Sequence, residues 1–542
     1  MPDAQQKFKK ATSKLINNFD AVVIGAGFAG LFMLYKLREL GLMVRVFEAA
    51  SELGGTWFWN RYPGARCDVE SMEYSYQFSE ELQQEWKWTE RYASQPEILS
   101  YINYVADKFQ LRQDIQFNTR VKMASFNEAI NRWTIEMVDG QKVNAQFCIM
   151  ATGCLSAPNL PKFKGLETFE GSLYHTGNWP AEKIDFSGKT VGIIGTGSSA
   201  VQSIPLIAQE AKHLFVFQRS PNYVVPARNK PIDPLIEQQI KADYVSFRER
   251  NNRKPAAVNI EYNDRSALDV TAEERQLEYE ARWEQGGFNF LGAFNDLPIN
   301  QAANETAAEF VRSKIRQVVQ DPAVAEMLSP HDVLGCKRLC LGTNYYETYN
   351  RPNVTLIDVS GWPIEEIMQN GLKVKGKEYT LDCLVLATGF DAMTGALLKI
   401  DIRGKNGTTL KQKWGAGPKS YLGIGINGFP NLFTITGPGS PSVLSNMLPS
   451  IEQHVNWIAE CIEYMRKHDF ISIEPTKEAE EAWVSHVNEV ASQTLLTTCN
   501  SWYLGANIPG KPRVFMPYIG FPAYVDKCTE VVLNGYKGFA LN

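Results

Sequence analysis

Two segments of the chain carry the same glycine-rich pattern, and this repeat limits the possible folds more than any other feature. The first, residues 20–48, reads as an apolar strand, a turn containing Gly25, Gly27 and Gly30, a helix, and a second strand ending in Glu48. In such a turn the first glycine permits tight bending, the second lets the backbone approach a pyrophosphate, and the third allows helix and strand to pack closely. A terminal carboxylate accepts hydrogen bonds from ribose hydroxyls. Because every part is present in order, the segment predicts a Rossmann-like dinucleotide-binding fold.

The second segment, residues 189–222, repeats the strand, the glycine turn and the helix, but its second strand ends differently. Gly195 and Gly197 occupy the turn, and the strand is followed by Arg219 and Ser220 with no carboxylate. An acid there would repel a 2′-phosphate, whereas a guanidinium beside a hydroxyl can bind one. We therefore expect the first segment, which ends in a carboxylate, to bind FAD, and the second, which ends in Arg219 and Ser220, to bind NADP. An ordinary surface arginine is the alternative interpretation of Arg219.

Two further strands, at residues 148–158 and 383–392, contain Ala-Thr-Gly and resemble the points where two-dinucleotide flavoproteins cross between domains. The predicted fold class is therefore α/β, with two dinucleotide-binding Rossmann-like domains and a charged helical insertion in the NADP domain. Thr271-x-x-Glu274 and Thr306-x-x-Glu309 predict capped helix starts within that insertion. The predicted division is an FAD domain at 1–152 and 390–542, an NADP domain at 153–226 and 335–389, and the insertion at 227–334.

Composition excludes several classes of protein. The 542 residues are too many for one compact core, and 21% charged residues with a net charge of −5 give no reason to expect a nucleic-acid partner. No apolar run approaches a membrane span and the first residues lack a secretory pattern, so we expect a cytoplasmic protein without membrane contact. Nine dispersed cysteines predict reduced thiols without disulfides, and six histidines without ligand spacing predict no metal site. We expect a monomer or a weak dimer.

Two longer motifs are more specific than the nucleotide folds. The segment FEGSLYHTGNWP places Phe169, Gly171, His175 and Trp179 at the fixed positions of F-x-G-x-x-x-H-x-x-x-W. The segment at 54–68, GGTWFWNRYPGARCD, fills every position of [AG]-G-x-W-x(4)-[FY]-P-[GM]-x(3)-D. Both resemble signatures of the type I Baeyer–Villiger monooxygenases, and the resemblance extends over nearly the whole chain. It is nearest to the branch that contains cyclohexanone and phenylacetone monooxygenases, on the phenylacetone side.

The resemblance implies an FAD-dependent, NADPH-consuming enzyme that inserts one oxygen atom from O2 next to a ketone carbonyl, giving an ester or lactone. In that family the reduced flavin captures O2 as a C4a-peroxyflavin, which requires water to be excluded and negative charge to be stabilised. Arg338, which follows Lys337, matches the family's catalytic arginine, a side chain that stays charged at any working pH. Asp68 ends the second motif and matches the carboxylate that orients this arginine. A plain structural salt bridge is the alternative interpretation of the pair.

The same resemblance assigns the binding residues. It places Trp57 and Trp502 beside the nicotinamide or its ribose, and a turn at 437–447 against the flavin, although a purely structural turn is an alternative. The substrate is expected to be an apolar ketone of moderate size. On the FAD side the implied residues are Gly25, Gly27, Gly30, Glu48, Gly55, Thr56, Trp57, Asp68 and Met447. On the NADP side they are Gly195, Thr196, Gly197, Ser198, Ser199, Gln202, Arg219, Ser220, Lys337 and Trp502. The implied substrate pocket comprises Ser442, Val443, Leu444 and Met447.

Other interpretations stay open at this point. His175 is assigned a conformational role at a domain linker, with an ordinary hydrogen-bonded core histidine as the alternative. A flavin monooxygenase that oxygenates nitrogen or sulfur would share both nucleotide folds but would not need the Arg338–Asp68 pair or Trp179. A non-catalytic, FAD-binding redox sensor is an alternative of another class. Sulfoxidation is an expected side activity of the favoured enzyme.

Overall fold

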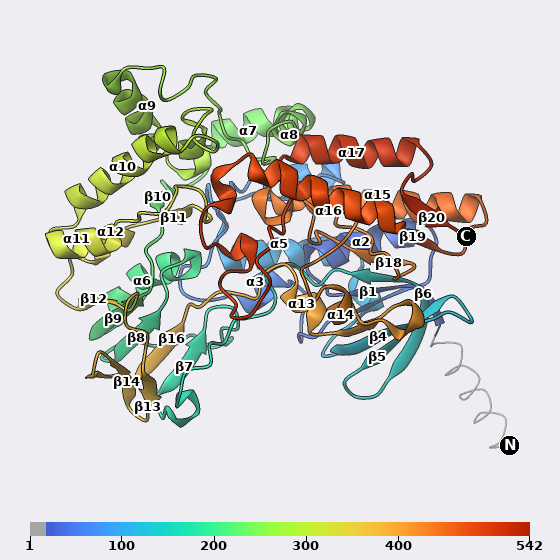
Figure 1. Ribbon diagram of the computed structural model, residues 1–542, viewed down its shortest axis with the longest axis horizontal. Coiled ribbons are helices and arrows are strands. Elements are labelled where there is room, and N and C mark those ends of the chain that lie inside the picture. The colour runs from blue at the N-terminus through green and yellow to red at the C-terminus, as the bar shows by residue number, and fades with distance from the viewer. Residues whose placement is uncertain (1–17) are drawn as a thin grey trace.

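The computed structural model of the protein describes residues 18–542, which form an α/β architecture of two main sheets flanked by helices (Figure 1). Residues 1–17, which include the first residues expected to lack a secretory pattern, lie outside the described part of the chain. Strand β1 (Asn18–Ile24), helix α2 (Phe28–Glu39) and strand β2 (Val44–Phe47) form the first predicted unit. Leu31, Leu34 and Leu37 of this helix are buried in the core.

The first main sheet has eight strands and is mixed. Strand β1 pairs in parallel with β2 and with β6, whereas β5 pairs antiparallel with both β4 and β6. Its order is β17-β4-β5-β6-β1-β2-β3, and β18 pairs with β6. Strands β17 and β18 come from the C-terminal part of the chain, so both ends of the sequence build this sheet. The strands not yet bounded are β3 (Ile115–Gln116), β4 (Val121–Asn127), β5 (Arg132–Met137), β6 (Lys142–Met150), β17 (Asp401–Arg403) and β18 (Leu432–Thr434).

The second main sheet has five strands in the order β12-β9-β8-β16-β7, and all of its pairs are parallel. The second predicted unit lies here as strand β8, helix α6 (Ser198–Glu210) and strand β9. The strands are β7 (Ser172–His175), β8 (Thr190–Ile194), β9 (His213–Gln218), β12 (Val354–Asp358) and β16 (Cys383–Leu386). Three small sheets comprise β10 (Val224–Pro226) with β11 (Cys340–Gly342), β13 (Glu366–Met368) with β14 (Gly371–Val374) and β15 (Lys377–Thr380), and β19 (Ile473–Pro475) with β20 (Phe539–Leu541).

The two Ala-Thr-Gly segments occupy matching positions in the two sheets. A Cβ added to Gly25 would lie 2.5 Å from the carbonyl oxygen of Ala151, and a Cβ added to Gly195 would lie 2.4 Å from that of Ala387. Both glycines have positive φ, at 107° and 110°. Each glycine turn therefore packs against the backbone that follows the neighbouring strand, and only glycine fits there.

Helices cover the sheets and the space between them. Figure 1 shows α9, α10 and α11 grouped at one side of the molecule, while α15, α16 and α17 run beside one another above the first sheet. Helix α15 packs along α2, which carries the C-terminal part of the chain onto the first nucleotide unit. The helices are α3 (Thr56–Trp59), α4 (Glu80–Glu85), α5 (Gln95–Lys108), α7 (Pro234–Ala242), α8 (Tyr244–Asn252), α9 (Ala272–Gln285), α10 (Gln301–Val318), α11 (Pro322–Leu328), α12 (Tyr345–Thr348), α13 (Gly395–Leu398), α14 (Leu410–Lys413), α15 (Met447–Lys467), α16 (Lys477–Ser492) and α17 (Phe521–Leu533).

One of the two predicted capping boxes is present and the other is wrong. Thr271 accepts from the backbone of Glu274, whose carboxylate accepts from Thr271 N–H in return, at the start of α9. Thr306 instead lies inside α10, where its hydroxyl donates to Ala303 O. Helix α10 begins earlier because Asn300 accepts two hydrogen bonds from its first turn, so the T-x-x-E spacing at 306–309 is a coincidence within a helix.

The expectation of reduced thiols throughout is wrong for one pair. Cys336 and Cys499 form a disulfide with Cα atoms 6.1 Å apart, although 163 residues separate them in the chain. Sequence spacing could not show this pairing, because the fold brings two distant loops together. The other seven cysteines, all within residues 18–542, are buried free thiols.

Candidate active site

The first glycine turn faces a second glycine-rich backbone from the 54–68 motif. A Cβ added to Gly27 would lie 3.4 Å from Gly55 Cα, and one added to Gly55 would lie 2.9 Å from Gly27 Cα. Gly55 has a φ of 53° and precedes α3, which begins at Thr56. Two bare backbones thus meet at the N-termini of α2 and α3, an arrangement that suits a pyrophosphate because exposed N–H groups can face it.

Glu48 closes this site on the side expected for the ribose. Its carboxylate is 5% exposed and accepts hydrogen bonds from Ala26 N–H and Ala50 N–H, both at 2.7 Å. An ionised carboxylate has about four acceptor positions, so two backbone bonds leave capacity for two hydroxyl groups. The Glu48 carboxylate therefore keeps acceptor positions free, and the two backbone bonds fix its orientation.

The second glycine turn is open on the side where a ligand would bind. A Cβ added to Gly197 would meet nothing within 4 Å. The Thr196 hydroxyl donates to Ser220 O at 3.0 Å, which ties the turn to the end of β9. Arg219 lies beside Ser220 and is exposed. Ser198 and Ser199 follow at the N-terminus of α6, where backbone N–H groups favour an anion.

Two glycine turns of this kind in one chain are typical of oxidoreductases that hold two dinucleotides. Over the described residues, no group of histidine, cysteine, aspartate or glutamate side chains could hold a metal ion. Likewise, between residues 18 and 542 no helix has the length and apolar character needed to cross a membrane.

Arg338 and Asp68 form a bidentate ion pair between the two nucleotide sites. Arg338 Nε donates to Asp68 Oδ2 at 2.6 Å, and Arg338 Nη2 donates to Asp68 Oδ1 at 2.7 Å. A third bond runs from Arg338 Nη1 to Val443 O at 2.8 Å, and the Phe288 ring lies 5.2 Å below the guanidinium. Since a guanidinium has five N–H donors, two remain for another acceptor.

This environment keeps Arg338 charged. Burial lowers the pKa of the Arg338 guanidinium, but the adjacent Asp68 carboxylate outweighs burial and holds that pKa above its ordinary value. The Tyr503 phenol lies close to the same guanidinium, whose charge lowers the phenol's pKa, but burial is the larger effect and raises the pKa of Tyr503 to about 12. The site therefore presents a permanent cation beside a neutral phenol, in a partly buried setting where the Arg338 side chain is 27% exposed and charge acts more strongly than in open water.

Val443 belongs to a strained turn that forms one wall beside Arg338. Ser442 is completely buried and has a φ of 42°, a left-handed conformation that non-glycine residues rarely adopt. Its hydroxyl contacts the sulfur of Met393, which itself has a φ of 64°. Strained backbone of this kind persists only where the surrounding structure enforces it and is concentrated at functional sites. Helix α15 then begins at Met447, so the predicted turn-to-helix transition is present.

The F-x-G-x-x-x-H-x-x-x-W motif lies where the two crossing segments meet. His175 Nδ1 accepts from Gly177 N–H at 2.9 Å, so Nε2 carries the proton and faces Asn159 O at 3.3 Å and Thr388 Oγ1 at 3.2 Å. Burial lowers the pKa of His175, which favours the neutral ring. His175 thus links the two crossing segments through hydrogen bonds, and the arrangement fits a conformational role and an ordinary core histidine equally.

The remaining motif residues stabilise the same junction. Trp179 is buried against Tyr174, with ring centroids 5.2 Å apart, and its backbone N–H donates to Trp59 O. A Cβ on Gly171 would lie 2.6 Å from Asp382 O, and Phe169 packs in the small core beneath. These residues link the second sheet to the 54–68 motif and contribute no group to the Arg338 site.

Several predicted binding residues have structural partners of their own. The indole of Trp57 is buried and donates to Tyr74 OH at 3.2 Å. Gln202 accepts from Tyr62 OH at 2.9 Å and donates to Arg66 O at 3.2 Å, so its amide joins α6 to the 54–68 motif. Lys337 forms an ion pair with Asp332 at 2.5 Å; Lys337 and Arg338 both line a small hollow with Pro221 and Asn222.

Sequence reasoning missed three residues that adjoin the predicted ones. Phe288 lies in the helical region predicted as an insertion, Met393 follows the second crossing segment, and Tyr503 neighbours the predicted Trp502. Of the three, only Tyr503 could have been anticipated from the sequence, because it directly follows the predicted Trp502 in the stretch SWYLGANIPGKP, residues 501–512. Side-chain contacts over such distances in the chain are set by the fold.

Comparison with known proteins places this site in a family. The family model for pyridine nucleotide-disulphide oxidoreductases matches residues 22–282. The chain is 47% identical to a Baeyer-Villiger monooxygenase of Pseudooceanicola batsensis, over 96% of this chain and 95% of that protein. It is 51% identical to a solved steroid monooxygenase bound to NADP, with a TM-score of 0.92 over 97% of this chain and 99% of that one. It is 42% identical to a cyclohexanone monooxygenase from Rhodococcus sp. Phi1 bound to NADP+, with a TM-score of 0.95 over 97% and 99%.

The chain belongs to the Baeyer–Villiger monooxygenase family. It is therefore a flavin-dependent oxidoreductase that uses FAD and NADPH to insert one oxygen atom next to a ketone carbonyl. This confirms the family, the enzyme class, the cofactors and the reaction predicted from the sequence. The two other interpretations, an oxygenase of nitrogen or sulfur and a redox sensor, are not favoured.

Proposed function

We propose that the reaction takes place beside Arg338, with an apolar ketone of moderate size as substrate and an ester or lactone as product. FAD, when bound and reduced by NADPH, would supply the chemistry that activates O2. The observation that carries the proposal is the Arg338 guanidinium, fixed by Asp68 and Val443 O with two N–H groups unused. Negative charge develops on a carbonyl oxygen when the carbonyl carbon is attacked, and a preorganised cation stabilises that charge without reorganising.

The neighbouring side chains support water exclusion and an apolar substrate. Val443, Met393 and Tyr503 belong to one buried cluster, against which Leu444 and Met447 pack. Among the predicted pocket residues only Ser442 is polar, and its hydroxyl is turned toward the Met393 sulfur. An apolar wall beside one cation matches a ketone, which needs burial for its carbon skeleton and a donor for its oxygen.

We base the proposed cofactor sites on the first and second glycine turns. We assign the FAD pyrophosphate to the Gly27–Gly55 contact with Glu48 on its ribose, and the NADPH 2′-phosphate to Arg219 and Ser220. Support comes from the open space at Gly197 and the spare acceptor capacity of Glu48. We propose that Lys337 joins Arg219 once the phosphate competes with Asp332, and that Gln202 aligns the 54–68 motif with α6.

We also propose a domain division and a setting for the enzyme. The division is FAD domain at 1–152 and 390–542, NADP domain at 153–226 and 335–389, and helical insertion at 227–334, supported by the two sheets and by the run of helices α7 to α11. We propose a cytoplasmic setting, where a reducing environment would keep the seven free thiols of the described residues reduced and would act on the Cys336–Cys499 disulfide. We propose a monomer or weak dimer, which sedimentation would test.

Replacing Arg338 tests the proposed site directly. Arg338→Ala should retain reduction of bound FAD by NADPH while ester formation from phenylacetone falls at least about 100-fold, comparable to the loss of an oxyanion donor. Arg338→Lys should recover little activity, because a lysine cannot span Asp68 and Val443 O together. Benzyl acetate is measured by gas chromatography and flavin reduction by absorbance. An ester yield in Arg338→Ala equal to that of the unmodified enzyme would remove Arg338 from the mechanism.

A further inference from the structure

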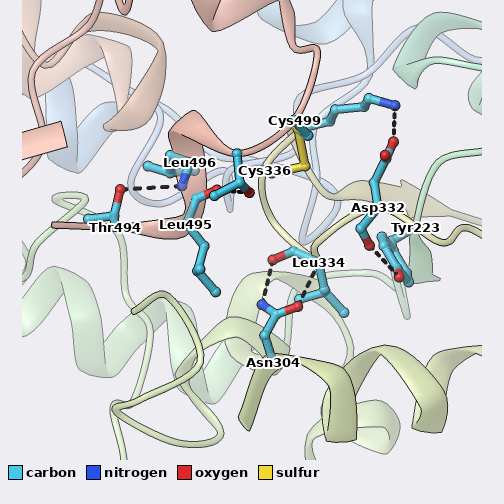
Figure 2. Close-up of a disulfide and its surroundings, with 11 residues drawn as sticks. Tyr223, Asn304, Asp332, Leu334, Cys336, Thr494, Leu495, Leu496 and Cys499 are labelled. Carbon is cyan, nitrogen blue, oxygen red and sulfur yellow. Dashed lines mark hydrogen bonds and ion pairs between the residues drawn. A yellow bond between two sulfur atoms is a disulfide. The ribbon is translucent and has the colours of Figure 1, made fainter. Parts of the chain in front are cut away.

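The disulfide between Cys336 and Cys499 joins the loop that carries Arg338 to the C-terminal segment that carries Tyr503 (Figure 2). Cys336 lies two residues before Arg338, and Cys499 lies four residues before Tyr503. We propose that this cysteine pair is a redox-controlled modification site: the disulfide holds residues 499–511 against the Arg338 site, and its reduction releases them. The regulatory consequence rests on the proposed function, whereas the release itself does not.

The Cys336 side of the bond is firmly held without the disulfide. Asn304 of α10 is buried, accepts from Leu334 N–H at 2.9 Å and donates to Leu334 O at 2.9 Å (Figure 2). The Tyr223 hydroxyl donates to Asp332 O at 2.8 Å, and the Asp332 carboxylate pairs with Lys337. Arg338 itself is fixed by three further hydrogen bonds. Breaking the disulfide therefore leaves this loop in place.

The Cys499 side depends on fewer contacts. Upstream, Leu495 N–H donates to Pro298 O at 2.8 Å; downstream, Asn507 donates to Phe390 O at 2.7 Å. Lys511 pairs with Asp391 at 2.5 Å and closes the segment at its far end. Within the described residues, the disulfide is the one covalent cross-link between this segment and the loop that carries Arg338. Without it, Tyr503 is held by packing against Phe515 and Met516 and by the bond from Met516 N–H to Tyr503 O at 3.0 Å, contacts that carry no covalent restraint against local opening.

The two cysteines differ in solvent exposure, and the more exposed one is open to attack by a reductant. Cys336 is 1% exposed, whereas Cys499 is partly exposed and lies between exposed Thr498 and Asn500. A thiolate of an external dithiol can therefore attack Cys499 Sγ, which breaks the S–S bond and releases Cys336 as a thiolate that takes up a proton. The second thiolate of the dithiol then attacks the mixed disulfide and releases Cys499 as a thiol. Two electrons pass from the dithiol, which becomes a disulfide, to the cysteine pair.

Release of residues 499–511 would remove their side chains from the Arg338 site and leave the Asp68 side of that site unchanged. The Tyr503 phenol would leave the guanidinium, and the predicted nicotinamide contact of Trp502 would be lost with it. More water would then surround the Arg338 side chain, which is already 27% exposed, and charge stabilisation weakens as the local dielectric rises. Reduced enzyme should therefore consume NADPH with less of it converted into ester, while Arg338 keeps its bond to Asp68.

Two measurements on the holoenzyme test the release without using oxygenation. Thiols titrated in denaturant should number seven before dithiothreitol treatment and nine after it. Limited chymotrypsin digestion, followed by mass spectrometry, should cut after Trp502 or Tyr503 about tenfold faster in the reduced enzyme, as expected for a segment losing local stability. Nine thiols before reduction, or equal cleavage rates in both states, would overturn the proposal.

Two variants separate the disulfide from other effects of reduction. Cys499→Ser should be cleaved rapidly with or without dithiothreitol, and its coupling of NADPH to ester should match that of the reduced parent enzyme. Asn500→Ala, an exposed neighbour that keeps both cysteines, should still respond to dithiothreitol. A Cys499→Ser enzyme that still responds, or unchanged coupling after reduction, would contradict the regulatory role. The thiol count and cleavage rates stand even if Arg338→Ala retains ester formation, so failure of the proposed function is distinguishable.

Discussion

Arg338 and Asp68, 270 residues apart in the chain, meet through two short hydrogen bonds that present the guanidinium edge-on to a carboxylate. Three of the five N–H groups are thereby committed, counting the bond to Val443 O, and the direction of the other two is fixed. The Asp68 carboxylate thus holds the Arg338 guanidinium in position, and its negative charge partly offsets the positive charge of that guanidinium. Position matters more for catalysis, because a preorganised donor contributes only where it faces the developing charge.

Replacement of Asp68 by asparagine should separate position from charge. Asp68→Asn keeps the size of the side chain but removes one acceptor and the charge assistance, a loss of about 1.5–3 kcal/mol per bond. We expect kcat for ester formation to fall about 10- to 100-fold with little change in the KM for ketone. Asp68→Glu should recover part of the activity. Steady-state rates of ester formation measure these changes. The control is Glu90→Gln, which weakens the Arg66–Glu90 ion pair and should keep an activity close to that of the parent enzyme. An unchanged kcat in Asp68→Asn would show that Asp68 does not position Arg338.

Glu48 offers a test of the FAD site that does not involve turnover. In Glu48→Gln the amide nitrogen must face the N–H of Ala26 or Ala50, since both carboxylate oxygens now accept from backbone. That conflict and the lost ribose acceptor should raise the Kd for FAD about 10- to 100-fold. Fluorescence of released flavin on dilution measures the change. Glu39→Gln, which loses only an exposed pairing with Lys36, should retain FAD as the parent does. Equal retention by the Glu48 variant would exclude the assigned ribose contact.

The sequence predicts local patterns well and long-range contacts poorly, as these residues illustrate. Both glycine turns and their flanking strands lie where expected, because each pattern spans a short stretch whose geometry is decided locally. Arg338 and Asp68 were paired only through resemblance to a family. The disulfide between Cys336 and Cys499 was missed, since nothing in their spacing distinguishes them from the seven free thiols.

Local patterns also mislead where another signal competes. The Thr306-x-x-Glu309 spacing matches a capping box, but Asn300 caps the helix six residues earlier and places Thr306 in its interior. The strain at Ser442 has no signature either, because serine is not a residue type that predicts a positive φ. Its conformation is imposed by packing against Met393 and by the Arg338 bond to the next carbonyl.

Relief of that strain should stabilise the protein. Ser442→Gly removes the cost of a left-handed conformation in a side-chain-bearing residue, about 1 kcal/mol, and loses only a hydroxyl contact with sulfur. We expect a higher free energy of unfolding in urea, together with lower ester formation because the Val443 carbonyl is held less firmly. Ser442→Ala keeps the strain and should show no gain in stability. A Ser442→Gly protein no more stable than Ser442→Ala would mean that the surrounding packing favours this conformation without cost.

Two buried carboxyl groups predict how stability depends on pH. Burial, reinforced by Glu70, raises the pKa of Glu73 to about 8, against a bond from Asn259 N–H and the charges of Arg248 and Lys254 that lower it. Burial likewise raises the pKa of Glu452 to about 7. The folded chain then binds protons that the unfolded chain has released above its ordinary carboxyl pKa of about 4.5. Stability should therefore fall as pH rises from about 4.5 to about 8, and level off above that.

Glu73→Gln should make this decline shallower, because an amide has no proton to lose. The Glu73 carboxylate has one oxygen bonded to Asn259 N–H, and within the described residues its other oxygen has no partner, so the charged form is poorly compensated. Urea unfolding at pH 5, 6.5 and 8.5 would measure the slope for the parent, for Glu73→Gln and for an exposed control, Glu167→Gln. The control should follow the parent. Parallel slopes for all three proteins would show that Glu73 releases its proton as readily in the folded chain as in the unfolded one.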